Sequence, residues 1–283
     1  MKVQTDFIYF NGKMFIKTLA WASLALALRI GFAQSIGQGV GPGGQLAAIT
    51  VMQQQIGLDD AAANERNPNG LRIQFQKISE VQQADGHLVK YRMLVPGVPE
   101  RQSYVLEVWR IGTEVQNTPQ QVYINAKGLL MWHEPRPNQE DKDSLDSKEE
   151  IEVELKSARG EPIRYILASP DGKLFIPGTV VPYPAENRNG NCRMETRLGF
   201  PEGEGMLVYL DGLASGAAVP LQTDSGSETH SQHAIADAHG HTVAIVAPFV
   251  PGNNAGVVKI SMTIKACSVS VDMPWGDGSY RPM

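Results

Sequence analysis

The chain of 283 residues has few of the side chains that usually mark a catalytic, metal or nucleic-acid site. It contains only two cysteines and six histidines, and its formal net charge is a mild −5. No basic patch is visible, which argues against a nucleic-acid partner. The nucleophile elbow of serine hydrolases is missing too, because Ser215 follows Ala214 rather than standing at the centre of a Gly-x-Ser-x-Gly motif. The sequence therefore predicts a protein that is not an enzyme.

The chain also has no long apolar run. The longest apolar segment is short and lies near the N-terminus. Residues 14–18 form a short basic segment, residues 19–28 are apolar, and Gly31-Phe32-Ala33 supplies small residues for a signal peptidase. This pattern predicts a cleaved bacterial signal peptide over residues 1–33, and hence a secreted, periplasmic or extracellular protein. The run is short for a membrane span, so no span is expected in the mature chain. The alternative is an N-terminal anchor that is not cleaved, and the presence of Arg29 within the segment is the reason to consider it.

Glycine and proline, by contrast, are plentiful, with 28 and 18 residues. Their number favours turns and short strands over long helices. One short helix is expected after the glycine-rich stretch 37–44, because apolar residues recur there near helical spacing. These residues are Leu46, Ile49, Met52 and Ile56.

From Leu71 onward the pattern changes to the period of two that is typical of strands. The segment Tyr104–Ile111 is apolar on both faces, which predicts a central strand. Turn signals at 126–128 and 170–172 stand between apolar segments and predict hairpins. We therefore predict an all-β protein with two β-sandwiches. Its expected parts are a signal peptide at 1–33, a flexible linker with a short helix at 34–70, a first sandwich at 71–182, a linker at 183–191, a second sandwich at 192–276 and a tail at 277–283.

The two cysteines stand at the two ends of the predicted second sandwich. Cys192 shares its strand face with Met194, Thr196 and Leu198, while Cys267 shares one with Val269, Val271 and Met273. Both thiols should therefore point into a core, and export places them in an oxidising compartment. We predict a disulfide between Cys192 and Cys267. Two buried free cysteines are the alternative.

The spacing of these cysteines and the alternation between them resemble the immunoglobulin-like or fibronectin-III-like modules of secreted bacterial proteins. The sequence departs from true immunoglobulin domains because no tryptophan lies midway between Cys192 and Cys267, and Trp275 follows the second one. The resemblance implies adhesion, scaffolding or glycan binding, without choosing among them.

Four of the six histidines fall within twelve residues, which makes them the main candidate for a metal site. Neutral imidazoles suit zinc, copper or nickel. No standard zinc spacing is matched, so the alternative is a set of exposed loop histidines. The candidates are His230, His233, His239 and His241.

Two further stretches are candidates for a ligand. The acidic run 140–150 has enough carboxylates for calcium, although Leu145 and Asp146 occupy positions that do not suit an EF-hand loop. Trp132, Trp275 and Tyr280 are candidates for a surface that binds a protein or a glycan, with a place in the core or at an edge as the alternative.

The function that we predict is a secreted, non-catalytic β-sandwich protein with a binding or structural role at the cell surface or in the envelope space. Two alternatives belong to other classes. One is a metal-binding module built on the histidine cluster. The other is an extracellular hydrolase acting on polysaccharide, because the acid pair of a glycosidase is defined by spatial rather than sequential distance.

Overall fold

The computed structural model describes residues 67, 69–83, 86–98, 102–113, 116–132, 150–200 and 203–276. This part of the chain contains sixteen β-strands and no α-helix, which confirms the all-β class for these residues. No described helix is long and apolar enough to cross a membrane. The predicted signal peptide, the helix near residue 50 and the tail at 277–283 lie outside the described residues.

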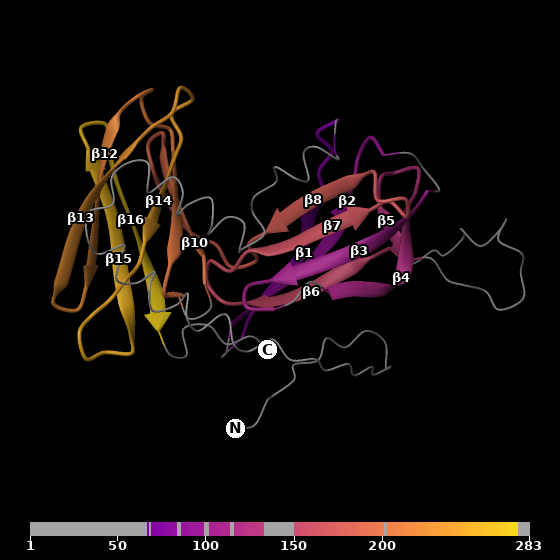
Figure 1. Ribbon diagram of the computed structural model, residues 1–283, viewed down its shortest axis with the longest axis horizontal. Helices are drawn as coiled ribbons and strands as arrows, with labels where there is room; N and C mark the ends of the chain where they lie inside the picture. The colour runs from indigo at the N-terminus through magenta and orange to yellow at the C-terminus, as the bar shows by residue number, and fades with distance from the viewer. Residues whose placement is uncertain are drawn as a thin grey trace, which may run out of the picture.

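The first eight strands form two antiparallel sheets that pack face to face (Figure 1). One sheet has the order β1-β2-β6 and the other the order β5-β4-β3-β7-β8. Their strands are β1 (Gln74–Gln83), β2 (Gly86–Leu94), β3 (Ser103–Arg110), β4 (Gln116–Ile124), β5 (Leu130–Trp132), β6 (Glu152–Ser157), β7 (Ile163–Ala168) and β8 (Phe175–Val180). A core shared by both sheets includes the fully buried Val89, Tyr104 and Leu167. The central position predicted for the segment from Tyr104 is confirmed, because β3 lies between β4 and β7.

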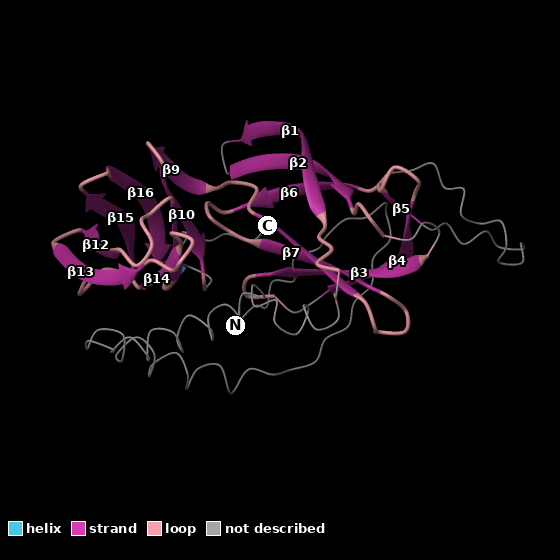
Figure 2. Ribbon diagram, turned by 90° about the horizontal axis from the view of Figure 1, so that it is seen from above, coloured by secondary structure: helices cyan, strands magenta, loops and turns pink. Residues whose placement is uncertain are grey.

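The last eight strands form a second pair of antiparallel sheets beside the first pair (Figures 1 and 2). The sheet orders are β14-β11-β10-β9 and β13-β12-β15-β16. The strands are β9 (Ala185–Asn189), β10 (Cys192–Leu198), β11 (Met206–Asp211), β12 (Ala218–Ser225), β13 (Glu228–Ile235), β14 (Thr242–Val246), β15 (Ala255–Ile264) and β16 (Cys267–Gly276). Alternate residues of β10 and β16, beginning with the two cysteines, are buried in the core between the sheets, as predicted.

The second sandwich begins earlier in the chain than the sequence indicated. The segment 183–191, predicted as a linker, contains β9, which pairs with β10 along its whole length. The pattern of this segment misled the prediction because β9 is an edge strand that is almost wholly exposed. Only Ala185 is buried in it, and the four residues that follow are exposed. A strand with one buried residue has no apolar alternation to read.

Side-chain amides join the edges of the two sheets in the second sandwich. Asn187 and Asn189 on β9 each donate a hydrogen bond of 2.9 Å, to the carbonyl oxygens of Ser270 and Ser268 on β16. At the opposite seam, Gln232 on β13 donates to the carbonyl oxygen of Ile245 on β14 at 2.8 Å. These bonds occupy main-chain acceptors that an exposed sheet edge would otherwise present to another strand.

Main-chain bonds join the edges of the first sandwich in the same way. Ile73 N–H donates to the Pro177 carbonyl of β8 at 3.0 Å, just before β1 begins. Ile151 N–H donates to the Leu130 carbonyl of β5 at 2.8 Å, just before β6 begins. Each sandwich is therefore hydrogen-bonded across both of its seams.

Candidate functional site

The structure does not gather the four clustered histidines into one site. His230 and His233 lie three residues apart on the exposed edge strand β13, so their side chains leave opposite faces of the strand. His239 and His241 lie in the turn that follows, and their amide groups both donate to Asp237 Oδ1. Among the described residues, no group of three or more histidines, cysteines or carboxylates is placed to hold a metal ion.

The carboxylate of Asp237 instead organises this turn. The amide of His241 and, less strongly, that of His239 lower the pKa of the Asp237 carboxyl group by hydrogen bonding to its charged form. His241 Nδ1 lies 2.6 Å from Asp211 Oδ1. This arrangement is that of a satisfied polar turn at one end of the second sandwich.

Of the three aromatic residues predicted as a ligand surface, the structure describes Trp132 and Trp275. Trp275 is only 6% exposed, and its indole N–H donates to Ser225 Oγ at 2.9 Å inside the second sandwich. Trp132 is partly buried against the first core. Tyr280 and the acidic run 140–149 lie outside the described residues. Trp275 followed the second cysteine on the apolar face of its strand, a signal of burial that could have been read from the sequence.

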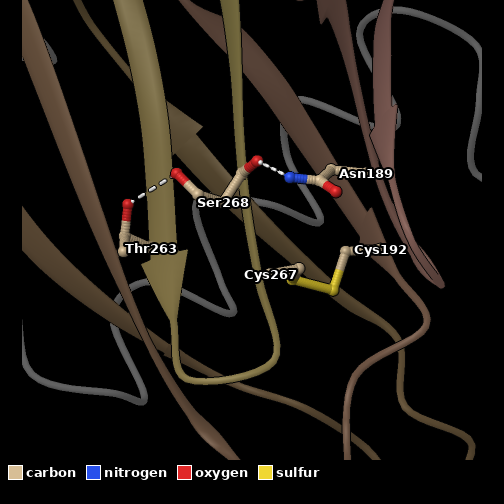
Figure 3. Close-up of a disulfide and its surroundings, with 5 residues drawn as sticks. All are labelled: Asn189, Cys192, Thr263, Cys267 and Ser268. Atoms are coloured by element: carbon tan, nitrogen blue, oxygen red, sulfur yellow. Dashed lines mark hydrogen bonds between the residues drawn. A yellow bond between two sulfur atoms is a disulfide. The ribbon is translucent and has the colours of Figure 1, made fainter.

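The predicted disulfide is present between Cys192 and Cys267, which are separated by 75 residues along the chain (Figure 3). It links the first residue of β10 in one sheet to the first residue of β16 in the other, and both cysteines are buried. Figure 3 shows Asn189 beside it, donating to the carbonyl oxygen of Ser268. The bond therefore crosses the core of the second sandwich at one end.

The most elaborate constellation of the described residues lies where the two sandwiches meet, and we call it the joint. The joint consists of the turns 110–113 and 158–161 of the first sandwich, the connection 181–184, and the parts of β10 and β16 that contact them. At its centre is Glu161, whose side chain is 0% exposed. Sequence reasoning did not single out these residues.

Arg110 binds the buried carboxylate of Glu161 with two parallel hydrogen bonds. Its Nε donates to Oε1 at 2.8 Å and its Nη2 to Oε2 at 2.9 Å. The amide of Ala158 donates to the same Oε2 at 3.0 Å, and Arg110 Nη2 also donates to the Lys156 carbonyl at 2.9 Å. Bidentate, charge-assisted pairing of this kind fixes geometry as well as charge. It holds the turn between β6 and β7 against the end of β3.

This turn presents Gly160 to the second sandwich. Gly160 N–H donates to the Tyr183 carbonyl at 2.7 Å, and the Gly160 carbonyl accepts a bond of 2.9 Å from the Leu198 amide on β10. The residue has a φ of +75°, and a Cβ atom there would lie 2.8 Å from the Thr196 carbonyl oxygen and 2.9 Å from Met273 Cε. Glycine is thus required here twice, by its backbone angle and by the close approach.

Apolar contacts complete the joint. Ile111, which follows β3, is 2% exposed and belongs to the core of the second sandwich rather than the first. Trp109 and Ala158 pack against the same core. In the connection between the sandwiches, the ring of Tyr183 stacks on the ring of His87 from β2, with centroids 3.9 Å apart. The two sandwiches therefore share packed side chains as well as hydrogen bonds.

A ladder of charges covers the outer face of the sheet that contains β10. Arg193 reaches Glu186 on β9, Asp211 on β11 and Glu195 on its own strand. Arg197 also pairs with Glu195, and its guanidinium lies 4.5 Å from the centroid of the Tyr209 ring. Opposite charges alternate across the strands, so each one is compensated within the sheet.

These geometries position main chain and compensate charge. The oxygens of the Glu161 carboxylate accept bonds from a guanidinium and an amide that hold a turn in place. The carboxylates of the ladder are each bound to arginine. The contacts of Glu161 thus fix the turn at 158–161, and the charges of the ladder are compensated within its own sheet.

Comparisons with known proteins give no family for the chain. No protein-family model matches it. No curated protein matches it either. Among solved structures, a tetra-tandem repeat in the extending region of a large adhesion protein is similar to 74% of the chain, at 8% sequence identity and a TM-score of 0.23. A 1.5-MDa bacterial ice-binding adhesin is similar to 73% of it, at 12% identity and a TM-score of 0.19.

The chain spans 50% of the first of these structures and 64% of the second. TM-scores this low say nothing about function.

Proposed function

We propose that this is a non-catalytic protein of the bacterial cell surface or envelope space, in which the joint holds two β-sandwiches at a fixed mutual orientation. The observation that carries the proposal is the pairing of the buried Glu161 with the partly buried Arg110, which holds the turn that presents Gly160 to the second sandwich. A flexible linker would need none of these contacts, since domains joined loosely meet through few of them.

The disulfide supports the location. Disulfides persist in oxidising compartments such as the periplasm and the cell exterior, and are rare in the cytosol. The predicted signal peptide at 1–33 agrees with export. The bond between Cys192 and Cys267 joins the two sheets through the core, as the inter-sheet bond of antibody domains does, and we base the likeness to immunoglobulin-like modules on this feature alone, because the sheet orders β14-β11-β10-β9 and β13-β12-β15-β16 differ from the immunoglobulin order.

The role we assign is to present or space a binding surface, with a protein or a glycan as partner. The absence of catalysis is part of the proposal. Incubation of the mature protein with a panel of polysaccharides tests it, with release of reducing ends as the readout. Release that disappears when single carboxylates are replaced would overturn the non-catalytic assignment in favour of the hydrolase.

Solution scattering on the mature chain tests the fixed orientation. We expect a single arrangement of the sandwiches to fit the wild-type curve. Gly160→Val should broaden the distribution of maximum dimensions, because the added side chain collides with the Thr196 carbonyl and with Met273.

Gly172→Val is the matched control, since Gly172 also has a positive φ, of +67°, but its Cβ would meet nothing within 4 Å. A wild-type curve that needs many orientations, or equal effects of the two substitutions, would refute the proposal.

A further inference from the structure

The chain enters and leaves the second sandwich at the same end. Two side-chain hydrogen bonds connect β9 to β16, from Asn187 to Ser270 and from Asn189 to Ser268. Residue numbers therefore rise along one strand as they fall along the other. The two strands are therefore antiparallel, and the start of β9 lies beside the later part of β16. Met273 of β16 and Thr196, which pairs with Ala185, both approach Gly160 of the joint.

The disulfide lies at the other end of these strands. Cys192 follows the turn that ends β9, and Cys267 follows the turn that ends β15. A pull between the first sandwich and the residues beyond Gly276 would therefore act on β9 and β16 at the joint and reach the disulfide last. Antiparallel strands pulled from one end separate bond by bond, since each bond bears the load in turn.

We propose that the disulfide is a stop that limits how far the second sandwich lengthens under tension. β9 leaves β10 and β16 leaves β15, beginning at the joint, and the separation ends at the bond between Cys192 and Cys267. The residues between the cysteines then lie outside the path of the force and stay folded. The inference rests on the proposed surface role, because that role is what would put the chain under load.

The lengths follow from the positions of the cysteines. The two segments that can straighten, 185–192 and 267–276, have a contour of about 60 Å at roughly 3.5 Å per residue. The segment closed by the disulfide spans 75 residues. Without the bond it would add about 260 Å at the same length per residue.

Force spectroscopy on the full mature chain, held at its two ends, tests the stop. In the oxidised protein we expect the second sandwich to give a short event of about 60 Å, at roughly 3.5 Å per residue. A reducing agent, or the double variant Cys192→Ser with Cys267→Ser, should lengthen the total by about 260 Å. The event from the first sandwich should be unchanged in all samples and serves as the internal control.

A second pair of variants tests the order of separation. Asn187→Ala combined with Asn189→Ala should lower the force at which the short event occurs without changing its length, because the two side-chain hydrogen bonds from β9 to β16 are lost. Asn191→Ala, in the exposed turn between β9 and β10, is the control.

Three results would overturn the inference: no short event in the oxidised chain, equal total lengths with and without the disulfide, or an unchanged force in the double alanine variant. Scattering without force tests the joint separately, so a failure here is distinguishable from a failure of the proposed function.

Discussion

Removal of the disulfide should destabilise the second sandwich far more than the first. The bond closes a segment of 75 residues, and the chain-entropy relation for a segment of that size gives about 4.5 kcal/mol at 25 °C. The variant Cys192→Ala with Cys267→Ala loses that constraint on the unfolded chain. It keeps small apolar side chains at both buried positions.

Amide hydrogen exchange measures this effect for each sandwich separately. In the variant, the slowest amides of β10, β12 and β15 should exchange with a free energy of opening lower by about 4 kcal/mol. The amides of β3 and β7 should keep their wild-type values. In urea, the midpoint of the second sandwich should fall by about 2 M, for an m-value near 2 kcal/mol/M.

Two outcomes would refute this reasoning. Unchanged protection in β10, β12 and β15 would show that the bond does not constrain the unfolded state as the relation assumes. An equal loss of amide protection in β3 and β7 would show that the two sandwiches open as one unit. Reduction of the wild-type protein is the control, because it breaks the bond without changing the sequence.

Three further perturbations have outcomes that the structure specifies. Gly160→Ala should lower the free energy of unfolding by about 1–3 kcal/mol more than Gly172→Ala, as measured by thermal unfolding. Both glycines have a positive φ, but only at Gly160 would the added Cβ atom meet backbone and side-chain atoms within 3 Å. Trp275→Phe should lower the free energy of unfolding of the second sandwich by about 1 kcal/mol, because the buried Ser225 hydroxyl loses the hydrogen bond from the indole N–H. The hydroxyl of Ser169 and the amide of Lys173 lower the pKa of Asp171 to about 2, so this carboxylate contributes stability above about pH 4 that is lost as the pH falls toward 2. Asp171→Asn should therefore melt below wild type at pH 6, and the two melting temperatures should converge near pH 2. A constant difference across that range would contradict the titration of Asp171.

The core strands were predictable because burial leaves a period of two in the sequence. The alternation after Cys192 and Cys267 placed both sulfurs on buried faces, and the apolar segment from Tyr104 indicated a central strand. Turn residues marked the hairpins between β4 and β5 and between β7 and β8. In each case the signal lies within a few neighbouring residues.

The two mostly exposed strands and the candidate sites were not predictable in this way. β9 and β13 are mostly exposed, so their sequences look like polar linkers. The four histidines are close in sequence, but an extended strand directs successive side chains apart, so His230 and His233 diverge. Proximity along the chain was therefore a poor guide to proximity in space.

The joint shows most clearly what only the tertiary structure decides. Arg159-Gly160-Glu161-Pro162 has the composition of any surface turn, and nothing in it indicates a buried carboxylate. Glu161 is buried because Arg110, 51 residues away, binds it from the end of β3. Gly160 is constrained because β10 and β16 pass within 3 Å of the position of a Cβ atom. Local alternation and turn chemistry depend on neighbouring residues and can be read from the sequence by itself. Contacts between distant segments depend on how whole sheets pack, and only the folded chain brings them together.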